Sequence, residues 1–189
     1  MADITSELLS RHRAPVDQSS GRSPAAGPDP QLITFVELLF FAYRDFTREA
    51  DAALAEFGLG RAHHRVLHFV NRHSGLRVAD LLDILTITKQ SLSRVLKQLI
   101  DQGYIVQQAG SADRRERLLF PTERGRALAE RLAAPQLVRL SEALKAAGPG
   151  SEAVLRRFLE AMVNAEERPK VSSIMASPVP HQAGSKGDG

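Results

Sequence analysis

The stretch from Thr88 to Gln102 most constrains how this chain can fold, because it repeats apolar residues at helical spacing more cleanly than any other segment. Its apolar positions follow the i, i+3, i+4, i+7, i+8 pattern of an amphipathic helix. They are Leu92, Val95, Leu96, Leu99 and Ile100. Thr88 can cap the first turn, and Gly103 stands where a left-handed helix stop is expected. One face of this helix must pack on the core, which leaves the other for solvent or a partner.

The outer face of that helix carries residue types that suit DNA. Arginine can bond both acceptors of guanine, glutamine can pair with adenine, and serine or lysine can hold phosphates. An ordinary solvated helix face has a similar composition, so the neighbouring segments must decide between the two readings. The candidate DNA-binding residues of this helix are Thr88, Lys89, Gln90, Ser91, Ser93, Arg94 and Lys97.

The neighbouring segments predict a winged helix-turn-helix. A shorter stretch of helical spacing precedes the turn at residues 86–88, so the helix-turn-helix covers about residues 79–102. Extended residues, a polar tip and renewed alternation then predict a hairpin over about residues 104–121, and residues 76–78 can pair at the edge of a small sheet. The expected fold class is mainly α (α+β), in which the hairpin is the wing.

Positive charge is concentrated in this region. Residues 86–126 hold eight basic and four acidic side chains, a net +4 in a chain whose total is +3. Arginines on a thin exposed hairpin can enter a minor groove and sense its negative potential, and an acid beside them can orient one by an ion pair. The candidate DNA-binding residues of the wing are Asp113, Arg114, Arg115 and Arg117, with Asp113 as the orienting acid.

Helices are also expected on both sides of this module. Residues 31–57 contain no Pro or Gly, include five of the eight Phe residues and are apolar on several faces, which favours a subunit interface over a purely internal core role. Residues 122–167 predict further helices, the last with one broad apolar face. Residues 1–30 and 168–189 are expected to be disordered, because each is rich in Pro, Gly and Ser.

These residues resemble the MarR family of bacterial transcription regulators over about residues 32–167. The matching stretches are Arg65-Val66-Leu67, Ile87 through Gly103, Asp113-Arg114-Arg115 and Thr122-Glu123-Arg124-Gly125. One departure is Pro121, which stands where the family usually has Leu and leaves the wing angle open. A second is the absence of cysteine, which excludes sensing by thiol oxidation.

The resemblance implies a homodimer held by the helices at about residues 31–57 and 122–167. Such a dimer binds a pseudo-palindromic operator in double-stranded DNA, and a small molecule of unknown identity often controls its affinity. Arg115 matches the family's minor-groove arginine, and Asp113 matches its positioning acid. The expected dimerisation residues are Leu32, Phe35, Val36, Leu39, Phe40, Phe158, Leu159 and Met162.

Two alternatives to an effector-controlled DNA-binding regulator stay open. His64 and His68 lie four residues apart on a predicted helix and could bind zinc, although no third or fourth ligand is evident. The same fold can also serve as a protein-interaction module, against which the charge of the wing argues.

No phosphate-binding loop or metalloprotease motif is present, so neither an enzyme nor a cofactor is expected. No stretch is apolar enough to span a bilayer or serve as a secretory signal, so a cytoplasmic protein is expected.

Overall fold

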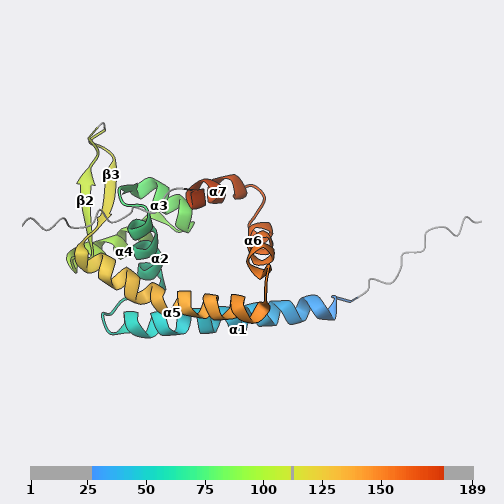
Figure 1. The fold of residues 1–189 in the computed structure, drawn as a ribbon. Coiled ribbons are helices and arrows are strands. Elements are labelled where there is room, and N and C mark those ends of the chain that lie inside the picture. The colour runs from blue at the N-terminus through green and yellow to red at the C-terminus, as the bar shows by residue number, and fades with distance from the viewer. Residues whose placement is uncertain (1–26, 112, 177–189) are drawn as a thin grey trace, which may run out of the picture. The chain divides into compact units, whose positions relative to one another are not determined.

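The computed structural model describes residues 27–111 and 113–176, and these form a mainly helical fold with one small sheet (Figure 1). The chain divides into two units, residues up to Phe41 and residues from Ala42 onward. In chain order the elements are α1 (Pro30–Ala55), α2 (Arg61–Arg72), β1 (Leu76–Arg77), α3 (Val78–Leu85), α4 (Lys89–Asp101), β2 (Ile105–Ala109), β3 (Arg117–Pro121), α5 (Glu123–Ala147), α6 (Ser151–Met162) and α7 (Arg168–Ala176).

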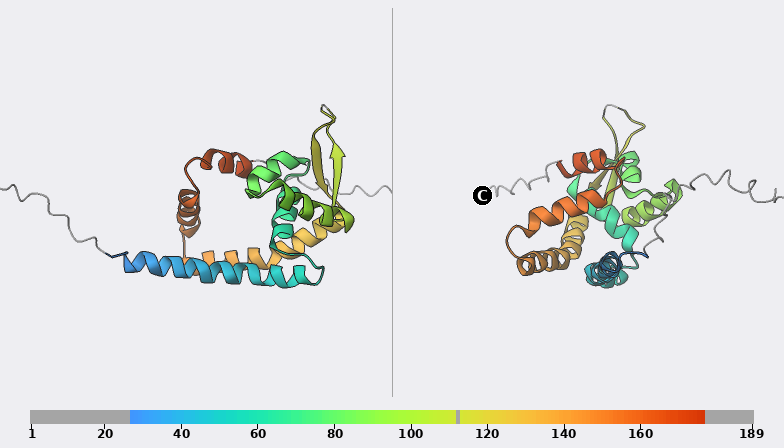
Figure 2. Two further views of the ribbon diagram at one scale, coloured as in Figure 1. Left: turned by 180° about the vertical axis from the view of Figure 1, so that it is seen from behind. Right: turned by 90° about the vertical axis from the view of Figure 1, so that its right-hand side faces the viewer.

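The winged helix-turn-helix lies in the second unit, where α3 and α4 form the helix-turn-helix and the hairpin of β2 and β3 forms the wing. The three strands are antiparallel in the order β1-β3-β2, and the two-residue strand β1 forms one edge as expected. The hairpin of β2 and β3 projects away from the helices in all three ribbon views (Figures 1 and 2). Pro121 ends β3 opposite Ile105, a position where its missing N–H interrupts no further pairing.

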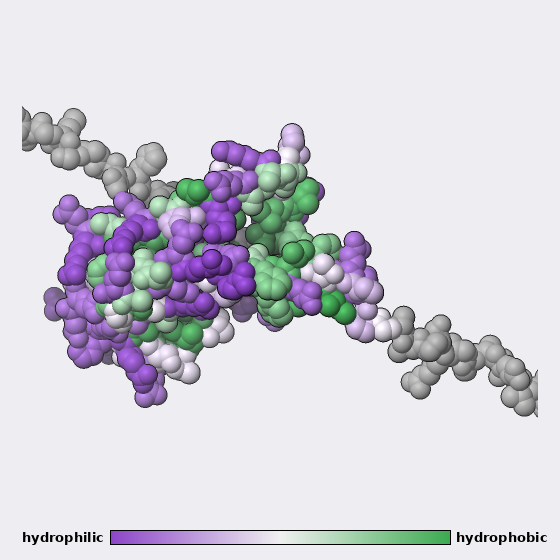
Figure 3. Space-filling model, turned by 90° about the horizontal axis from the view of Figure 1, so that it is seen from below, coloured by the Kyte–Doolittle hydropathy of each residue, from purple (hydrophilic) through white to green (hydrophobic). Residues whose placement is uncertain are grey.

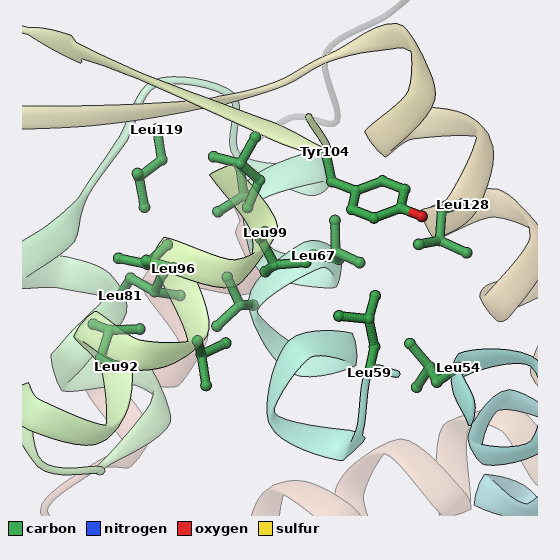
Figure 4. Close-up of a cluster of buried hydrophobic side chains, with 14 of the residues drawn as sticks. Leu54, Leu59, Leu67, Leu81, Leu92, Leu96, Leu99, Tyr104, Leu119 and Leu128 are labelled. Carbon is green, nitrogen blue, oxygen red and sulfur yellow. The ribbon is translucent and has the colours of Figure 1, made fainter. Parts of the chain in front are cut away.

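The core is built from leucine and valine side chains of α1 through α5 and the sheet. Leu54, Leu67, Leu81, Leu99 and Leu119 are among its fully buried members, and α4 contributes the apolar positions that its spacing predicted (Figure 4). Full burial of one such side chain contributes roughly 1.5–3 kcal/mol. The apolar face of α4 therefore anchors the helix, and its polar face is left at the surface.

A tight joint connects α4, β2 and α5. Helix α4 ends in a Schellman motif, in which Gly103 adopts a φ of 73° and the N–H of Tyr104 donates to the carbonyl of Leu99 at 2.9 Å. The hydroxyl of Thr122 donates to the carbonyl of Gly103 at 2.7 Å and accepts from the N–H of Gly125 at 2.9 Å. The same threonine thus caps α5 and fastens it to the end of α4.

Glycine at position 125 permits this joint. A Cβ atom there would lie 2.0 Å from the carbonyl oxygen of Tyr104, which is far inside any real contact. The neighbouring Arg124 places its guanidinium 4.6 Å from the centre of the buried Tyr104 ring and donates to the carbonyl of Gln102 at 3.0 Å. The Thr122-Glu123-Arg124-Gly125 motif therefore has a mechanical role, which is to bring the first turn of α5 against the start of the wing.

The C-terminal boundary differs from the sequence prediction. Residues 168–176 were expected to be disordered, but they form helix α7. Arg168 donates to the carbonyls of Ala161 and Val163, which satisfies the open end of α6, and Pro169 lies in the first turn of α7, where a proline is tolerated. The other predicted disorder, at residues 1–30, falls mainly outside the described residues, and Pro30 already belongs to α1.

Replacement of Gly125 tests the joint. Gly125→Ser forces a side chain against the Tyr104 carbonyl, so we expect a loss of about 1–3 kcal/mol in the free energy of unfolding, measured by urea denaturation. Gly60→Ser is the matched control, because Gly60 has an extended backbone, has no atom near its Cβ position and is the N-cap of α2. Equal effects of the two serines would show that the joint is not tightly packed.

Candidate nucleic-acid interface

The turn between α3 and α4 sets the exposure of α4. Thr86 adopts a left-handed conformation with a φ of 51°, which turns the chain sharply after α3. The hydroxyl of Thr88 then accepts from the N–H of Ser91 at 3.2 Å and donates to the Ser91 hydroxyl at 2.9 Å. Thr88 is the predicted N-cap, and its hydroxyl is already occupied in that role.

The polar face of α4 is open. All seven candidate residues of this helix are exposed, whereas Leu92, Val95, Leu96 and Leu99 are buried. Lys97 is paired with Asp101 at 2.6 Å, one turn further along. Arg94 makes no hydrogen bond or ion pair with any residue that the structure describes. Its five donors therefore remain free for a ligand.

The back of α4 is fixed by a small hydrogen-bond network that the sequence did not suggest. The N–H of Gly60 donates to Nδ1 of His63 at 3.0 Å, so Nε2 carries the proton and donates to Oε1 of Gln98, also at 3.0 Å. Nε2 of Gln98 in turn donates to the carbonyl of Gly58 at 3.0 Å. The network joins α4 to the start of α2 and to the turn before it.

The wing presents its arginines as predicted, but Asp113 acts differently from the expectation. All four candidate wing residues are exposed. An ion pair between Asp113 and an arginine was expected; instead its carboxylate accepts from the backbone N–H of Arg115 at 2.8 Å. A short polar side chain often bonds the backbone two residues on, which explains the difference. The guanidinium of Arg117 donates to the carbonyl of Arg114 at 2.8 Å.

A groove of about 760 Å³ lies between α3, α4 and the wing. Its lining includes apolar side chains such as Leu82 and Leu96. It also holds three cations and two acids, which are Lys89, Lys97, Arg117, Asp83 and Asp101. Cations from both α4 and the wing therefore meet at one surface. This is the arrangement that a polyanion running past both elements requires.

A second cavity, of about 410 Å³, lies between the part of α1 after Ala42, α2 and α5. Phe46, Phe69, His64, His68 and Arg65 are among its lining residues. Burial lowers the pKa of His64 and of His68 from the ordinary histidine value. The charge of His68 adds to the effect on His64, which Asp51 opposes, and the charges of Arg72 and His73 add to the effect on His68. Within the described residues, no cluster of three or more potential metal ligands forms, so His64 and His68 stand as a pair.

The expected dimerisation residues are exposed in both units. In the first unit Leu32, Phe35, Val36, Leu39 and Phe40 are 38–69% exposed along α1, a segment with prominent green patches in the space-filling view (Figure 3). In the second unit Phe158, Leu159 and Met162 are about half exposed on α6. Large apolar surfaces of this kind mark interaction sites. Among the described helices, none is long and apolar enough to cross a membrane.

Comparison with known proteins places these features in context. A family model described as the MarR family matches residues 57–116. The HTH-type transcriptional regulator PetP of Rhodobacter capsulatus is 48% identical over 136 residues, which cover 72% of this chain and 82% of that protein. An HTH-type transcriptional repressor of Mycobacterium tuberculosis is 34% identical over 95 residues, which cover 50% of this chain and 67% of that protein.

Solved structures share the fold at lower identity. A mutant MarR from E. coli in complex with operator DNA matches with a TM-score of 0.55 at 19% identity, over 71% of this chain and 96% of that one. A SlyA-like transcription regulator from Listeria monocytogenes matches with a TM-score of 0.53 at 21% identity, over 79% of this chain and 91% of that one. The winged helix-turn-helix architecture predicted from the sequence is thereby confirmed.

The lowered histidine pKa values predict a loss of stability in mild acid. Because the folded chain keeps His64, His68 and His73 neutral to a lower pH than the unfolded chain does, the unfolded state binds more protons below about pH 6.5. The contribution of these histidines to the free energy of unfolding, measured in urea, should therefore be fully present above that pH and should be lost progressively as the pH falls below it. Replacing His64 and His68 by Gln should flatten this pH dependence. If the free energy of unfolding of the double variant fell with pH as steeply as that of the wild type, these histidines would not be its cause.

Proposed function

The chain belongs to the MarR family of transcription regulators, and from that premise we propose that it binds a pseudo-palindromic operator in double-stranded DNA as a homodimer. Each protomer presents α4 to the major groove of one half-site and the β2–β3 wing to the adjacent minor groove. Whether the bound protein represses or activates depends on the position of the operator relative to a promoter.

The observation that carries the proposal is the common exposure of the eleven candidate residues on α4 and the wing. On α4, Gln90 and Arg94 are the side chains suited to base edges, and Lys89 and Lys97 to phosphates. Lys97 must break its ion pair with Asp101 to reach a phosphate. This costs little free energy because both side chains of the pair are highly exposed. On the wing, Arg115 extends from a backbone held in place by Asp113.

The homodimer is supported by the apolar side chains exposed on α1 and α6. A two-fold dimer buries the same patch from both protomers and places two recognition helices about one DNA turn apart. A second copy of this chain is therefore the partner that we expect to cover these apolar side chains. A two-fold dimer also explains why the target is pseudo-palindromic. A protein-interaction module of the same fold would not require the cationic surface on α4 and the wing.

Control by a small molecule is supported by the cavity between α1, α2 and α5. Its aromatic side chains, Phe46 and Phe69, offer apolar contact, and Arg65 and the histidines offer hydrogen bonds to polar groups of a ligand. A ligand held there contacts the same helix α2 whose His63 binds Gln98 of α4. Occupancy of the cavity can therefore shift the position of α4.

The role of Arg94 can be tested with Arg94→Ala. The free guanidinium on the open face of α4 should bond a base, so its removal should cost about 1–3 kcal/mol on the preferred operator and relax base preference. Binding is measured by fluorescence anisotropy on the operator and on a random duplex. Arg48→Ala, which removes an exposed arginine from α1, is the control. An equal loss on both duplexes would assign Arg94 to phosphate contact.

The dimer can be tested with Phe158→Glu. A two-fold partner that covers the exposed half of the Phe158 side chain contributes roughly 0.7–1.5 kcal/mol per protomer, about half the value for burial of a whole side chain, and a charge there opposes burial further. Light scattering at micromolar concentration should show a dimer for the wild type and a monomer for the variant. Val106→Glu makes the same kind of change on the exposed face of β2 and should leave the dimer intact. A monomeric wild type would overturn the dimer.

A further inference from the structure

An ion-pair fork connects the helix-turn-helix to the wing. Arg77 is the N-cap residue of α3, and its guanidinium binds the Asp80 carboxylate at two points, with Nε at 2.8 Å from Oδ2 and Nη2 at 2.7 Å from Oδ1. The remaining Nη1 donates to Oε1 of Glu116 at 3.2 Å. Both carboxylates raise the pKa of Arg77 above its already high ordinary value, Asp80 more strongly.

The backbone of Glu116 makes two hydrogen bonds at the tip of the wing. Its carbonyl accepts from the N–H of Gly110 at 3.2 Å, and its own N–H donates to the carbonyl of Asp113 at 3.0 Å. The carboxylate of Asp113 holds the N–H of Arg115 at 2.8 Å. A continuous series of hydrogen bonds therefore runs from Arg77 through Glu116 and Asp113 to the backbone of Arg115.

The tip of the wing leaves no room for a side chain at Gly110, because Asp113 and Glu116 lie against its backbone. A Cβ at Gly110 would lie 2.7 Å from the carbonyl oxygen of Asp113 and 3.2 Å from Cβ of Glu116. At its base, the wing is paired to β1 at only two positions, one of which is Arg77 opposite Leu118. The fork thus adds a side-chain restraint to a hairpin whose backbone attachment to β1 is short.

We propose that Arg77 is a positioning residue for the wing, which fixes the direction in which Arg115 meets the minor groove. The proposal rests on the function proposed above and adds a residue that need not touch DNA. Recognition requires side chains to be held within about 0.5 Å and 10–20° of the productive geometry, and a tilt at the base of a hairpin displaces its tip by more than that.

The strength of the fork depends on its geometry and on the connection of three charges. Arg77 is 51% exposed and Glu116 38% exposed, so a single pair of this kind contributes little. A bidentate contact within a network of three charges is the exception to that rule. Asp80, in the first turn of α3, holds the guanidinium in the orientation that Glu116 needs.

Glu116→Gln separates positioning from simple electrostatics, because the two predict opposite signs. Removal of an acid from a DNA-binding surface tightens binding if charge alone matters, since repulsion of the phosphates is relieved. If Glu116 holds the wing, the operator affinity at low salt should instead fall about two- to fivefold. Asp101→Asn is the matched control: it removes an acid that pairs with Lys97 on α4 and should tighten binding.

A double-mutant cycle with Arg115→Ala tests whether the effect passes through the wing arginine. Glu116→Gln should weaken binding in the wild-type background but should not weaken it in the Arg115→Ala background, where only the relief of phosphate repulsion remains. Arg77→Lys keeps the charge but not the fork, so it should weaken binding as Glu116→Gln does, whereas a residue that only contacts phosphate would tolerate lysine. Thermal unfolding midpoints within about 2 °C of wild type would show that the variants are folded.

Unchanged or tighter binding by Glu116→Gln would overturn the proposal, as would additive losses in the cycle. Wild-type protein that selects no operator from random-sequence DNA would overturn the proposed function itself, and the wing proposal with it. Failure of the proposed function is seen with the wild-type protein alone, whereas failure of the wing proposal is seen only with the variants, so the two failures are distinguishable.

Discussion

The joint at Thr122 and Gly125 is the contact on which the rest of the DNA-binding half depends. One hydroxyl closes the end of α4, and the same hydroxyl caps the start of α5, while the bare backbone of Gly125 lets the two approach within van der Waals distance. Helix α4 ends at this point, and the first strand of the wing and the long helix α5 begin there. Their mutual angles are therefore set by the backbone turn at Gly103, the short Thr122 side chain and the close approach at Gly125.

In the regulator proposed here, side-chain hydrogen bonds and ion pairs surround this closely packed joint. The joint fixes α4 against α5, the His63–Gln98 hydrogen bonds fix α4 against α2, and the fork at Arg77 fixes the wing against α3. Of these, the contacts of α2 lie beside the cavity between α1, α2 and α5. In the proposed control, a ligand that displaces α2 would change the position of α4, while the joint would keep the wing and α4 together.

Periodicity and turn chemistry were enough to predict nearly every element from the sequence, because α4 and the wing use strong local signals such as Thr88, Gly103 and the alternation before Pro121. The signals failed where a long-range contact decides the outcome. Helix α7 was missed because the tail from residue 168 was assigned to disorder as a whole from its Pro-, Gly- and Ser-rich composition, whereas Arg168 joins residues 168–176 to α6. The candidate residues were identified by type, but the partner of Asp113 and the contact of Arg77 with Glu116 depend on geometry, since the latter joins positions 39 apart.

Hydroxyl-radical footprinting on an operator selected from genomic DNA tests the central claim most directly. Two-fold recognition by α4 and the wing predicts a symmetric pattern, with two blocks of protection about one helical turn apart on one face of the duplex and flanking protection where each wing enters the minor groove. A single unsymmetrical block, or protection that does not depend on sequence, would contradict a dimer that reads a pseudo-palindrome through these two elements.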